Sequence, residues 1–387
     1  MERLLHEAAD ECDLVLSSGS TSASAVDVVY RVIEERGDLR LHGVAVKPGK
    51  PMLVGTIGES AYVGLPGYPI SALTIFRTFV APLVREAAGV PEPRTATVTG
   101  EMAVRERYTE GRRRLMPVGL VEDGDGRTLV YPVDKGSGAT TSLVDADGTV
   151  AMEPDTDVLD AGDGVEVTLF SPDVRPPTLL GAGEDDPLFA RLLDGLDRPR
   201  YLASGTGEGV RQLAQNVPDV AVLVGPDADH DGVELGGWTR EWGLVVDPSN
   251  DVRGLESLVD GDLRFVNRDG GSGLRRSFDA ALERFAAERE QSVADVRSGI
   301  DGYDLTTKAH ESPARKVAGG TADTGLGLRA TAEKLGLDFV TLGTERVRVV
   351  ANPDRTGKPG VDRLCDLLAG VDSLAEGLAG YDGVGEP

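Results

Sequence analysis

Hydrophobic and polar positions in the first 90 residues alternate between a helical period and short apolar runs. Apolar residues recur at helical spacing in Glu2–Glu11, in Val26–Arg36 and again from Pro69, a residue suited to the first turn of a helix. The apolar runs between these segments predict strands at 13–17, 39–46 and 62–65. Alternating strands and helices predict a mainly parallel sheet, although too few strands are present for a complete doubly wound domain.

The pattern changes after residue 90 to short strands of period two, separated by turn signals such as EDGDG and DADG. The strand candidates up to residue 171 are TATVTGEM, RRLMPVGLV, RTLVYPV, TVAMEP and GVEVTLF. Short strands at this spacing predict a small β-barrel.

A proline-rich linker, SPDVRPP, precedes a third segment in which strands and helices alternate again. Its predicted strands are YLASG, VAVLVG, GLVVD, LRFVN and VRVVAN, and its predicted helices lie near 207–215, 273–289 and 331–335. The whole pattern predicts an α/β protein in three parts, with boundaries at 1–90, 91–171 and 178–387.

The composition is strongly acidic, with 65 Asp and Glu against 40 Lys and Arg and a formal net charge of −25. Such a surface repels nucleic acid and anionic membranes, so we expect neither as a partner. Low lysine, abundant aspartate and few aromatic residues are typical of proteins from a high-salt cytoplasm, such as that of haloarchaea. An ordinary acidic protein is the alternative.

The two cysteines, Cys12 and Cys365, lie far apart and define neither a disulfide framework nor a zinc site. The first residues, MERLLHEAADEC, are unlike a secretory signal, and no apolar run approaches the length of a membrane span. We therefore expect a cytoplasmic protein.

Candidate chemistry in the first part lies in three loops, SSGSTS, KPGKP and GLPGYP. The first and third follow predicted strands and precede helices, where unpaired backbone N–H groups bind anions. KPGKP contains two of only seven lysines in the chain, and its prolines restrain the backbone so that the ammonium groups converge. Each loop taken alone is also consistent with a solvated turn. Asp27 is consistent with a surface carboxylate, a ligand of a polar ring edge or a ligand of a bridging cation.

These loops carry a resemblance. LVLSSGSTSASAVDVVYRVI, GVAVKPGKP and GLPGYPISAL, in this order, resemble the MogA-like molybdopterin-binding domain of the molybdopterin molybdenumtransferase (MoeA/gephyrin E) family. GSGATTSLVDADGTVAMEPDTDVLDAGDGVEV is similar to the C-terminal β-barrel of that family. The resemblance implies insertion of molybdate into adenylylated molybdopterin (molybdopterin-AMP), with release of AMP and with Mg²⁺ as the divalent cation.

The resemblance also implies roles for individual residues. Those expected to bind the cofactor are Ser18, Gly19, Ser22, Pro51, Gly67 and Ser137, and the candidate catalytic residues are Lys47, Lys50 and Asp27. Ser18, Gly19 and Ser22 would contact the phosphate side of the pterin, whereas the lysine loop and Ser137 would form the molybdate end. Ammonium and hydroxyl donors suit a dianionic oxometallate that must react beside a second anion.

Several positions depart from the family pattern. They are Ser20, Thr21 and Ala23 in the first loop, Tyr68 in place of the Asn of GLPGNP, and Pro117 in place of a barrel arginine, with Arg112 to Arg114 nearby. The family's two N-terminal dimerisation domains and the front half of its pterin-binding domain have no counterpart. A misassigned start, a split gene or a decayed copy would each explain this, and a separate N-terminal part or a homodimer is the expected partner.

The third segment resembles periplasmic-binding-protein-like (PBP-like) domains found in such enzymes and in molybdate-responsive regulators. The resemblance lies in RFVNRDGGSGLRRSFD, GYDLTTKAH and VAGGTADTGLGLRATAEKLGLDFVTLGTERVRVV. Ser204, Thr206, Arg268 and Ser272 are candidates for binding a small oxyanion, with His310 as a further donor. Leu274 replaces the hydroxyl residue of the usual GSGTR, and helix caps and solvated turns are the alternative interpretation.

The sequence leaves two functions open. The first is an enzyme, or part of one, that acts in molybdenum cofactor biosynthesis. The second is a molybdate- or tungstate-binding or sensing protein with a vestigial transferase part. KPGKP and GLPGYP favour the first, whereas the missing front half and Pro117 favour the second. Molybdate and tungstate share their charge and nearly their size, so the sequence does not distinguish them.

Overall fold

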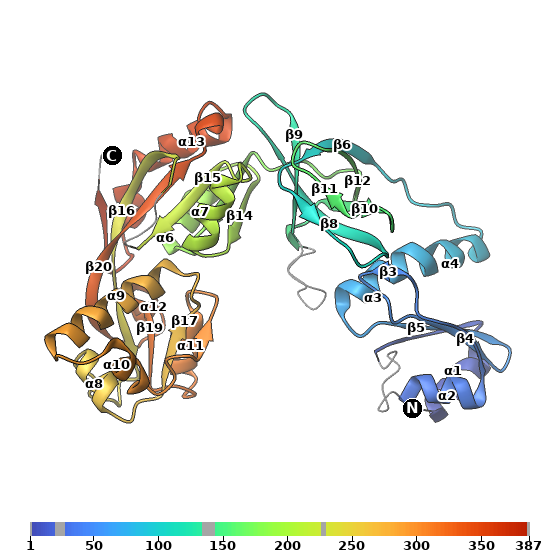
Figure 1. Ribbon diagram of the computed structural model, residues 1–387, viewed down its shortest axis with the longest axis horizontal. Helices are drawn as coiled ribbons and strands as arrows, with labels where there is room; N and C mark the ends of the chain where they lie inside the picture. Colours follow the sequence, from blue (N-terminus) through green and yellow to red (C-terminus); the bar gives the residue numbers. More distant parts are fainter. Residues whose placement is uncertain (1, 20–27, 134–143, 226–229, 385–387) are drawn as a thin grey trace. The chain divides into compact units, whose positions relative to one another are not determined.

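The computed structural model describes residues 2–19, 28–133, 144–225 and 230–384. The chain divides into two compact units (Figure 1). The first contains Met1–Glu122 and Arg127–Pro176, and the second contains Asp123–Gly126 and Pro177–Pro387. No helix of the described residues is long and apolar enough to cross a bilayer.

The first unit begins with a four-stranded sheet in the order β1-β5-β4-β2. Its strands are β1 (Leu14–Ser18), β2 (Asp38–His42), β4 (Leu53–Ile57) and β5 (Ser60–Leu65). Apolar side chains of α1 (Glu2–Glu11) and α2 (Val28–Arg36) pack with one set of strand residues, including Val15 and Leu53. Met52 and Leu65 pack instead with Ile75 and Val80 of the segment that follows β5.

Only β1 and β5 of this sheet are parallel. β5 pairs with β4, and β4 with β2, in antiparallel register, so the prediction of a mainly parallel sheet was wrong in detail. The physical reason is a tight hairpin: β4 and β5 are joined only by Gly58 and Glu59, and Gly58 adopts a φ of 59°. The expected strand at 39–46 is also divided, into β2 and the two-residue β3 (Val46–Lys47).

The helix predicted from Pro69 extends to residue 88 in three sections. They are α3 (Pro69–Ile75), a π-helical turn η1 (Phe76–Val80) and α4 (Ala81–Ala88). Gly89, with a φ of 65°, ends the helix in the left-handed conformation that glycine adopts without steric cost.

The rest of the first unit contains a closed sheet, as the period-two pattern predicted. Its order is β10-β12-β6-β9-β8-β3, and a further pairing of β10 with β8 closes five of these strands into a barrel. The strands are β6 (Thr97–Met102), β8 (Arg113–Glu122), β9 (Thr128–Pro132), β10 (Gly148–Met152) and β12 (Gly164–Leu169). A separate ladder joins β7 (Glu106–Arg107) to β11 (Val158–Leu159). Alternate residues of β8, Met116, Val118 and Leu120, lie in the barrel core.

The second unit is a nine-stranded sheet with helices, in the order β14-β13-β15-β20-β16-β19-β17-β18, with β21 paired to β16. The strands are β13 (Leu179–Gly183), β14 (Pro199–Ala203), β15 (Val220–Val224), β16 (Val233–Val246), β17 (Phe265–Arg268), β18 (Thr306–Thr307), β19 (Thr324–Leu328), β20 (Asp338–Ala351) and β21 (Tyr381–Val384). The helices are α6 (Pro187–Asp194), α7 (Thr206–Ala214), α8 (Leu255–Asp260), α9 (Gly273–Glu288), α10 (Val293–Ser298), α11 (Ser312–Ala318), α12 (Arg329–Lys334), the 3₁₀ turn η2 (Pro353–Arg355), α13 (Pro359–Leu368) and α14 (Val371–Ala375).

This unit has two lobes with separate cores. The first lobe contains β13, β14, β15, α6, α7, α13 and α14, and the second contains β17, β18, β19 and α8 to α12. The long strands β16 and β20 run through both lobes (Figure 1). Trp238 of β16 lies in the first core and Trp242, four residues on, lies in the second. The α/β fold class is confirmed in its main features, whereas the full length of these two strands was not predicted.

Candidate functional site

Two of the three predicted loops of the first unit lie next to each other because their strands are parallel neighbours. Ser18 of β1 is in register with Leu65 of β5, so both strands end at the same edge. The Ser18 hydroxyl donates to the Pro66 carbonyl at 3.2 Å, and the Gly19 amide donates to the Leu65 carbonyl at 3.0 Å. The structure therefore brings the loop of Ser18 and the loop of Gly67 together.

Glycine is required where these loops meet. Gly19 has a φ of 91°, a conformation that other residues rarely adopt. A Cβ atom added to Gly67 would lie 3.3 Å from the Gly19 Cα atom. The two glycines therefore let the backbones of the two loops approach each other closely. The helix that follows is uncapped, because the exposed Tyr68 makes no side-chain hydrogen bond at its N-terminus.

The lysine loop packs against the same helix. Gly49 has a φ of 123°, and a Cβ atom there would lie 2.3 Å from the Ile75 side chain, so only glycine allows this close packing. The loop is closed by a hydrogen bond from the Val44 amide to the Lys50 carbonyl at 3.0 Å. Pro51 is half-buried, whereas the Lys50 side chain is exposed.

Lys47 lies where the lysine loop meets the barrel. Its strand β3 pairs with β8, which places Lys47 beside Arg114. The Lys47 ammonium group is 2.7 Å from a Glu110 carboxylate oxygen and 5.1 Å from the centre of the Tyr108 ring, which Arg114 also faces at 5.3 Å. Sequence reasoning missed both Glu110 and Tyr108, because nothing in the pattern pairs them with a lysine more than sixty residues away.

Glu110 is the anion that Lys47 contacts in this structure. Hydrogen bonds from Lys47 and then from Arg112 hold the pKa of Glu110 below its usual value. Both carboxylate oxygens of Glu110 are engaged, one by each cation. The pair is about two-fifths exposed, at 39% for Lys47 and 42% for Glu110, so solvent and solutes reach it.

Three predicted site residues, Ser22, Asp27 and Ser137, lie outside the described residues. Among the residues that the structure describes, no group of three or more His, Cys, Asp or Glu side chains is arranged to hold a metal ion. The described part of the first unit therefore offers an anionic ligand the uncapped start of α3 and the cationic side chains of the lysine loop, because the Ser18 hydroxyl and the Gly19 amide already donate to backbone carbonyls.

The predicted oxyanion residues of the second unit also lie together, around a carboxylate of the chain itself. Glu184 follows β13 and is 1% exposed. Its first oxygen accepts from the Ser272 hydroxyl at 2.6 Å and is 3.7 Å from an Arg268 nitrogen. Its second oxygen accepts from the Gly273 amide at 2.8 Å and from the Thr206 amide and hydroxyl, each at 3.1 Å.

The charge of Glu184 is stabilised inside the unit. Burial would raise its pKa, but the nearby Arg268 and Arg240, with hydrogen bonds from Ser272 and Gly273, bring the pKa below the usual value. Burial lowers the pKa of Arg268 in turn. Ser204, the remaining predicted residue, has a buried hydroxyl that finds no partner among the described residues.

Two neighbouring carboxylates extend this cluster. Asp185 is 2.7 Å from His310, and although burial would raise its pKa, the hydrogen bond from His310 keeps the pKa below its usual value. Asp186 caps α6 and binds the buried Arg240 at 2.7 Å. The sequence signal for this cluster was the run GEDDP directly after a buried strand, which the sequence analysis did not use.

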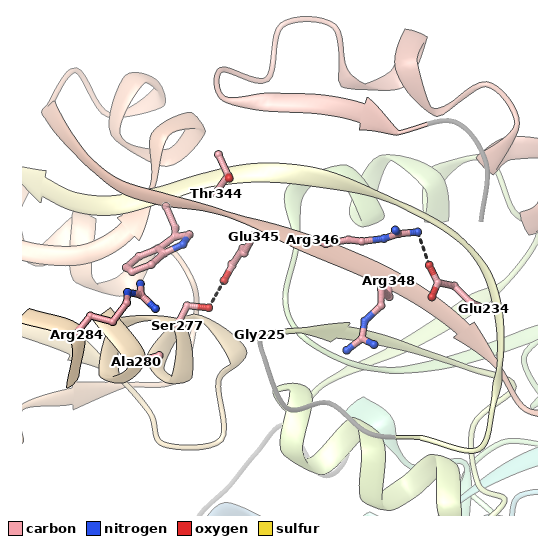
Figure 2. Close-up of a pocket in the computed structure, with 10 residues that line it drawn as sticks. Gly225, Glu234, Ser277, Ala280, Arg284, Thr344, Glu345, Arg346 and Arg348 are labelled. Atoms are coloured by element: carbon pink, nitrogen blue, oxygen red, sulfur yellow. Dashed lines mark hydrogen bonds and ion pairs between the residues drawn. The ribbon is translucent and has the colours of Figure 1, made fainter. Parts of the chain in front are cut away.

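A cavity of about 560 Å³ lies elsewhere in the second unit, beside β20 and α9 (Figure 2). Arg284, Arg346 and Arg348 line it, and Arg346 is paired with Glu234. Glu345 connects the cavity to the carboxylate cluster, because it accepts from Ser277 at 2.6 Å and also binds Arg240. Sequence analysis assigned no role to its lining residues.

Comparison with known proteins agrees with the order of these parts. Family models match a probable molybdopterin binding domain over 1–86, the MoeA C-terminal region (domain IV) over 99–170 and a PBP superfamily domain over 197–369. The chain joins molybdopterin-binding, MoeA C-terminal and PBP superfamily domains. The resemblance inferred from the sequence is thereby confirmed.

Individual relatives match the first two domains. Molybdopterin molybdenumtransferase of Haemophilus influenzae is 36% identical over 88 residues, which cover 23% of this chain and 22% of the relative. Molybdopterin molybdenumtransferase 2 of Mycobacterium tuberculosis is 29% identical over 174 residues, or 42% of each protein. A crystal structure of the MoeA protein of Pyrococcus horikoshii is 38% identical, covers 44% of this chain and 40% of its own, and gives a TM-score of 0.36. The chain spans less than half the length of these curated relatives.

Proposed function

We propose that this chain acts in molybdenum cofactor biosynthesis, and that its first unit provides the molybdopterin- and molybdate-binding part of a molybdopterin molybdenumtransferase. The proposed reaction inserts molybdate into molybdopterin-AMP with release of AMP. The observation that supports it is the packing of Gly49 on Ile75, which brings the lysine loop onto the helix that follows GLPGYP. The loop proposed to bind the phosphate and the loop proposed to bind molybdate then both contact the same helix, α3.

In this proposal each loop has a distinct task. Ser18, Gly19 and Gly67 lie on the phosphate side of the pterin, together with Ser22. The Ser18 hydroxyl and the Gly19 amide would exchange the Pro66 and Leu65 carbonyls for the ligand. Lys47 and Lys50 neutralise the molybdate dianion as it approaches a second anion, with Pro51 and Ser137 beside them. Lys47 would exchange Glu110 for the substrate, and an exposed ion pair costs little to exchange.

Mg²⁺ would enter this site with the substrate. Magnesium sites commonly use substrate phosphates, water and one or two carboxylates rather than a cage of protein ligands. Asp27 is the proposed carboxylate. The described residues contain no cluster of three metal-binding side chains, so substrate phosphates and water would supply the other ligands of the ion.

The test measures AMP release from molybdopterin-AMP in the presence of molybdate, using the full chain with and without an added N-terminal part from a relative. Lys47→Ala and Lys50→Ala should each lower the rate by roughly 100-fold, because each removes a charge that faces the oxyanion. Lys334→Ala is the matched control, since Lys334 is an exposed lysine of the second unit paired with Glu311. Unchanged rates in both loop variants would contradict the proposal.

Binding of molybdate or tungstate by the PBP superfamily domain is the second candidate function. It is favoured by the convergence of Thr206, Ser272 and Arg268 on one anionic group. That group is Glu184, however, so a free oxyanion would have to displace a carboxylate that belongs to the chain. Calorimetric titration of the full chain with molybdate, tungstate and sulfate decides between this second function and permanent occupation of the site by Glu184.

A further inference from the structure

Glu184 connects the two lobes of the second unit. It follows β13 in the first lobe, and Thr206, at the start of α7, belongs to the same lobe. Its other partners, Ser272, Gly273 and Arg268, belong to the second lobe, at the end of β17 and the start of α9. A single carboxylate therefore accepts hydrogen bonds from both lobes at once.

The donors around Glu184 form a built anion site rather than a chance contact. Four hydrogen bonds and one cation converge on two oxygen atoms, and the contributing side chains are buried. Charged groups are rarely buried unless they are paired in this way. The site is as dry and as rich in donors as a receptor for a small oxyanion would be.

Polar atoms without a hydrogen-bond partner in the described part of the chain lie on Arg268 and in the neighbouring loop. Two nitrogens of Arg268, Nε and Nη1, are buried without a hydrogen-bond partner among the described residues, and so is the hydroxyl of Ser204 in the neighbouring loop. A tetrahedral oxyanion has four oxygens where a carboxylate has two. Unfilled donors beside a filled carboxylate are consistent with a site whose free ligand would be larger than the group now in it.

We propose that Glu184 is a tethered anion that occupies the oxyanion site of the PBP superfamily domain and holds its lobes together, so that only loss of this carboxylate opens the site to a free tetrahedral oxyanion. The inference does not depend on the transferase function proposed for the first unit. A dianion placed beside the ionised Glu184 would meet like-charge repulsion in a dry site, which excludes simultaneous binding.

Two adjacent contacts support a closed arrangement. Asp185 of the first lobe is 2.7 Å from His310, which precedes α11 of the second lobe. Asp186 binds Arg240 on β16, and Arg240 in turn binds Glu345 on β20, so the third carboxylate fixes both long strands to the first lobe. Three consecutive carboxylates thus connect the first lobe to the second lobe or to the strands between them.

The test is rescue by an added anion. Thermal unfolding of the full chain is followed for wild type, Glu184→Ala and Glu333→Ala, an exposed control on α12, at one ionic strength set with KCl. Sulfate, molybdate or tungstate then replaces part of the KCl. Glu184→Ala should unfold at a lower temperature than wild type, and each oxyanion should raise its midpoint in proportion to the logarithm of concentration. Wild type and Glu333→Ala should show no such rise.

Each other result overturns the proposal. A specific rise of the wild-type midpoint, or heat of molybdate binding to wild type, would mean that Glu184 does not block the site. A folded Glu184→Ala protein that no oxyanion stabilises would mean that the pocket is not an oxyanion site. Glu184→Gln keeps the volume of the side chain but removes its charge. This variant replaces Glu184→Ala in the comparison of stability if the alanine variant does not fold. If Glu184→Gln is as stable as wild type, the carboxylate does not hold the lobes.

Discussion

Both units of this chain contain a cation paired with a carboxylate at a predicted anion site, but the two pairs differ in their exposure to solvent. Lys47 and Glu110 are 39% and 42% exposed, whereas Arg268 and Glu184 are 3% and 1% exposed. An exposed pair is screened by water and contributes little to stability, so exchanging its carboxylate for another anion would cost little. A buried pair cannot be separated without leaving an uncompensated charge.

The comparison shows that the same types of residue can form an accessible ion pair or a buried contact inside the fold. In the first unit the glycines Gly19, Gly49 and Gly67 allow close approach of the backbone, and the cations of the lysine loop remain accessible. In the second unit the donors of Thr206, Ser272 and Gly273 also converge on one point. The Glu184 carboxylate already occupies that point. The position of one carboxylate relative to the donors makes the difference, and sequence motifs do not report that position.

The largest effect should come from breaking the buried pair. Arg268→Ala removes the cation nearest to Glu184 and leaves its charge in a dry site, which should lower the free energy of unfolding by about 3–5 kcal/mol. Urea denaturation of the full chain measures this, with a signal assigned to the second unit. Arg253→Ala, which breaks an exposed pair with Asp251 in the same unit, is the control and should be close to neutral. Equal effects of the two substitutions would contradict a larger contribution of the buried pair to stability.

Acid should weaken the second unit through Glu184. Its folded pKa lies below the ordinary value of 4.5, so its ionised form stabilises the fold fully above that value, and the stabilisation is lost as pH falls through the folded pKa. Glu184→Gln cannot take up this proton. Its free energy of unfolding should therefore fall less steeply below pH 4.5, by up to about 1.4 kcal/mol per pH unit.

The titratable and charged groups that act on Glu184 allow this measurement to be interpreted. They are Arg268, Arg240, Tyr201 and Glu345, with Asp185 and Asp186 next in the chain. Asp185 has a lowered pKa as well, so it adds to the acid sensitivity of both proteins and does not cancel the difference between them. Parallel pH profiles for wild type and Glu184→Gln would show that Glu184 is not stabilised as an anion.

Hydrophobic periodicity within a short segment was enough to predict individual helices and strands. The helix predicted at Glu2–Glu11 is observed with the same bounds, and the one predicted at 273–289 is observed as Gly273–Glu288. The strand β4 was missed because its partner β5 follows after a two-residue turn, and the glycine-containing run was not recognised as a hairpin. The barrel was predicted because its strands are short and separated by turn signals, and because strands such as β12 alternate between buried and exposed residues.

Contacts between distant residues were beyond the reach of these patterns. Ser272 was predicted to bind an anion, but its partner Glu184 lies 88 residues earlier in the chain. The middle of β16 contains Arg240. From the sequence alone an arginine here would be expected on the surface, but it is buried between Asp186 and Glu345. Burial of a charge depends on partner side chains that a single sequence does not identify. The sequence therefore located the candidate residues but not the side chains that pair with them.

Salt should act on the whole surface more than on the buried pair. With a net charge of −25, self-repulsion is screened as salt increases, and the unfolding midpoint should rise from low salt toward molar KCl. The stability difference between wild type and Arg268→Ala should change little over that range, because a buried pair is screened much less. A midpoint that stays flat or falls would contradict the adaptation to high salt inferred from composition.

The smallest effect on stability should come from Glu110→Gln, which should instead change the affinity for the ligand. The substitution removes the anion that competes for Lys47 and Arg112 but keeps the side-chain shape, so the unfolding midpoint should stay nearly unchanged. Affinity for molybdopterin-AMP should instead rise by a few-fold, since an exposed pair need no longer be broken before the ligand binds. Titration of the full chain measures this, with Glu59→Gln, an exposed residue of the β4–β5 turn, as the control. Weaker binding by Glu110→Gln would indicate that Glu110 positions Lys47 for the substrate, and the exposed pair would then be as much a fixed part of its site as the buried one.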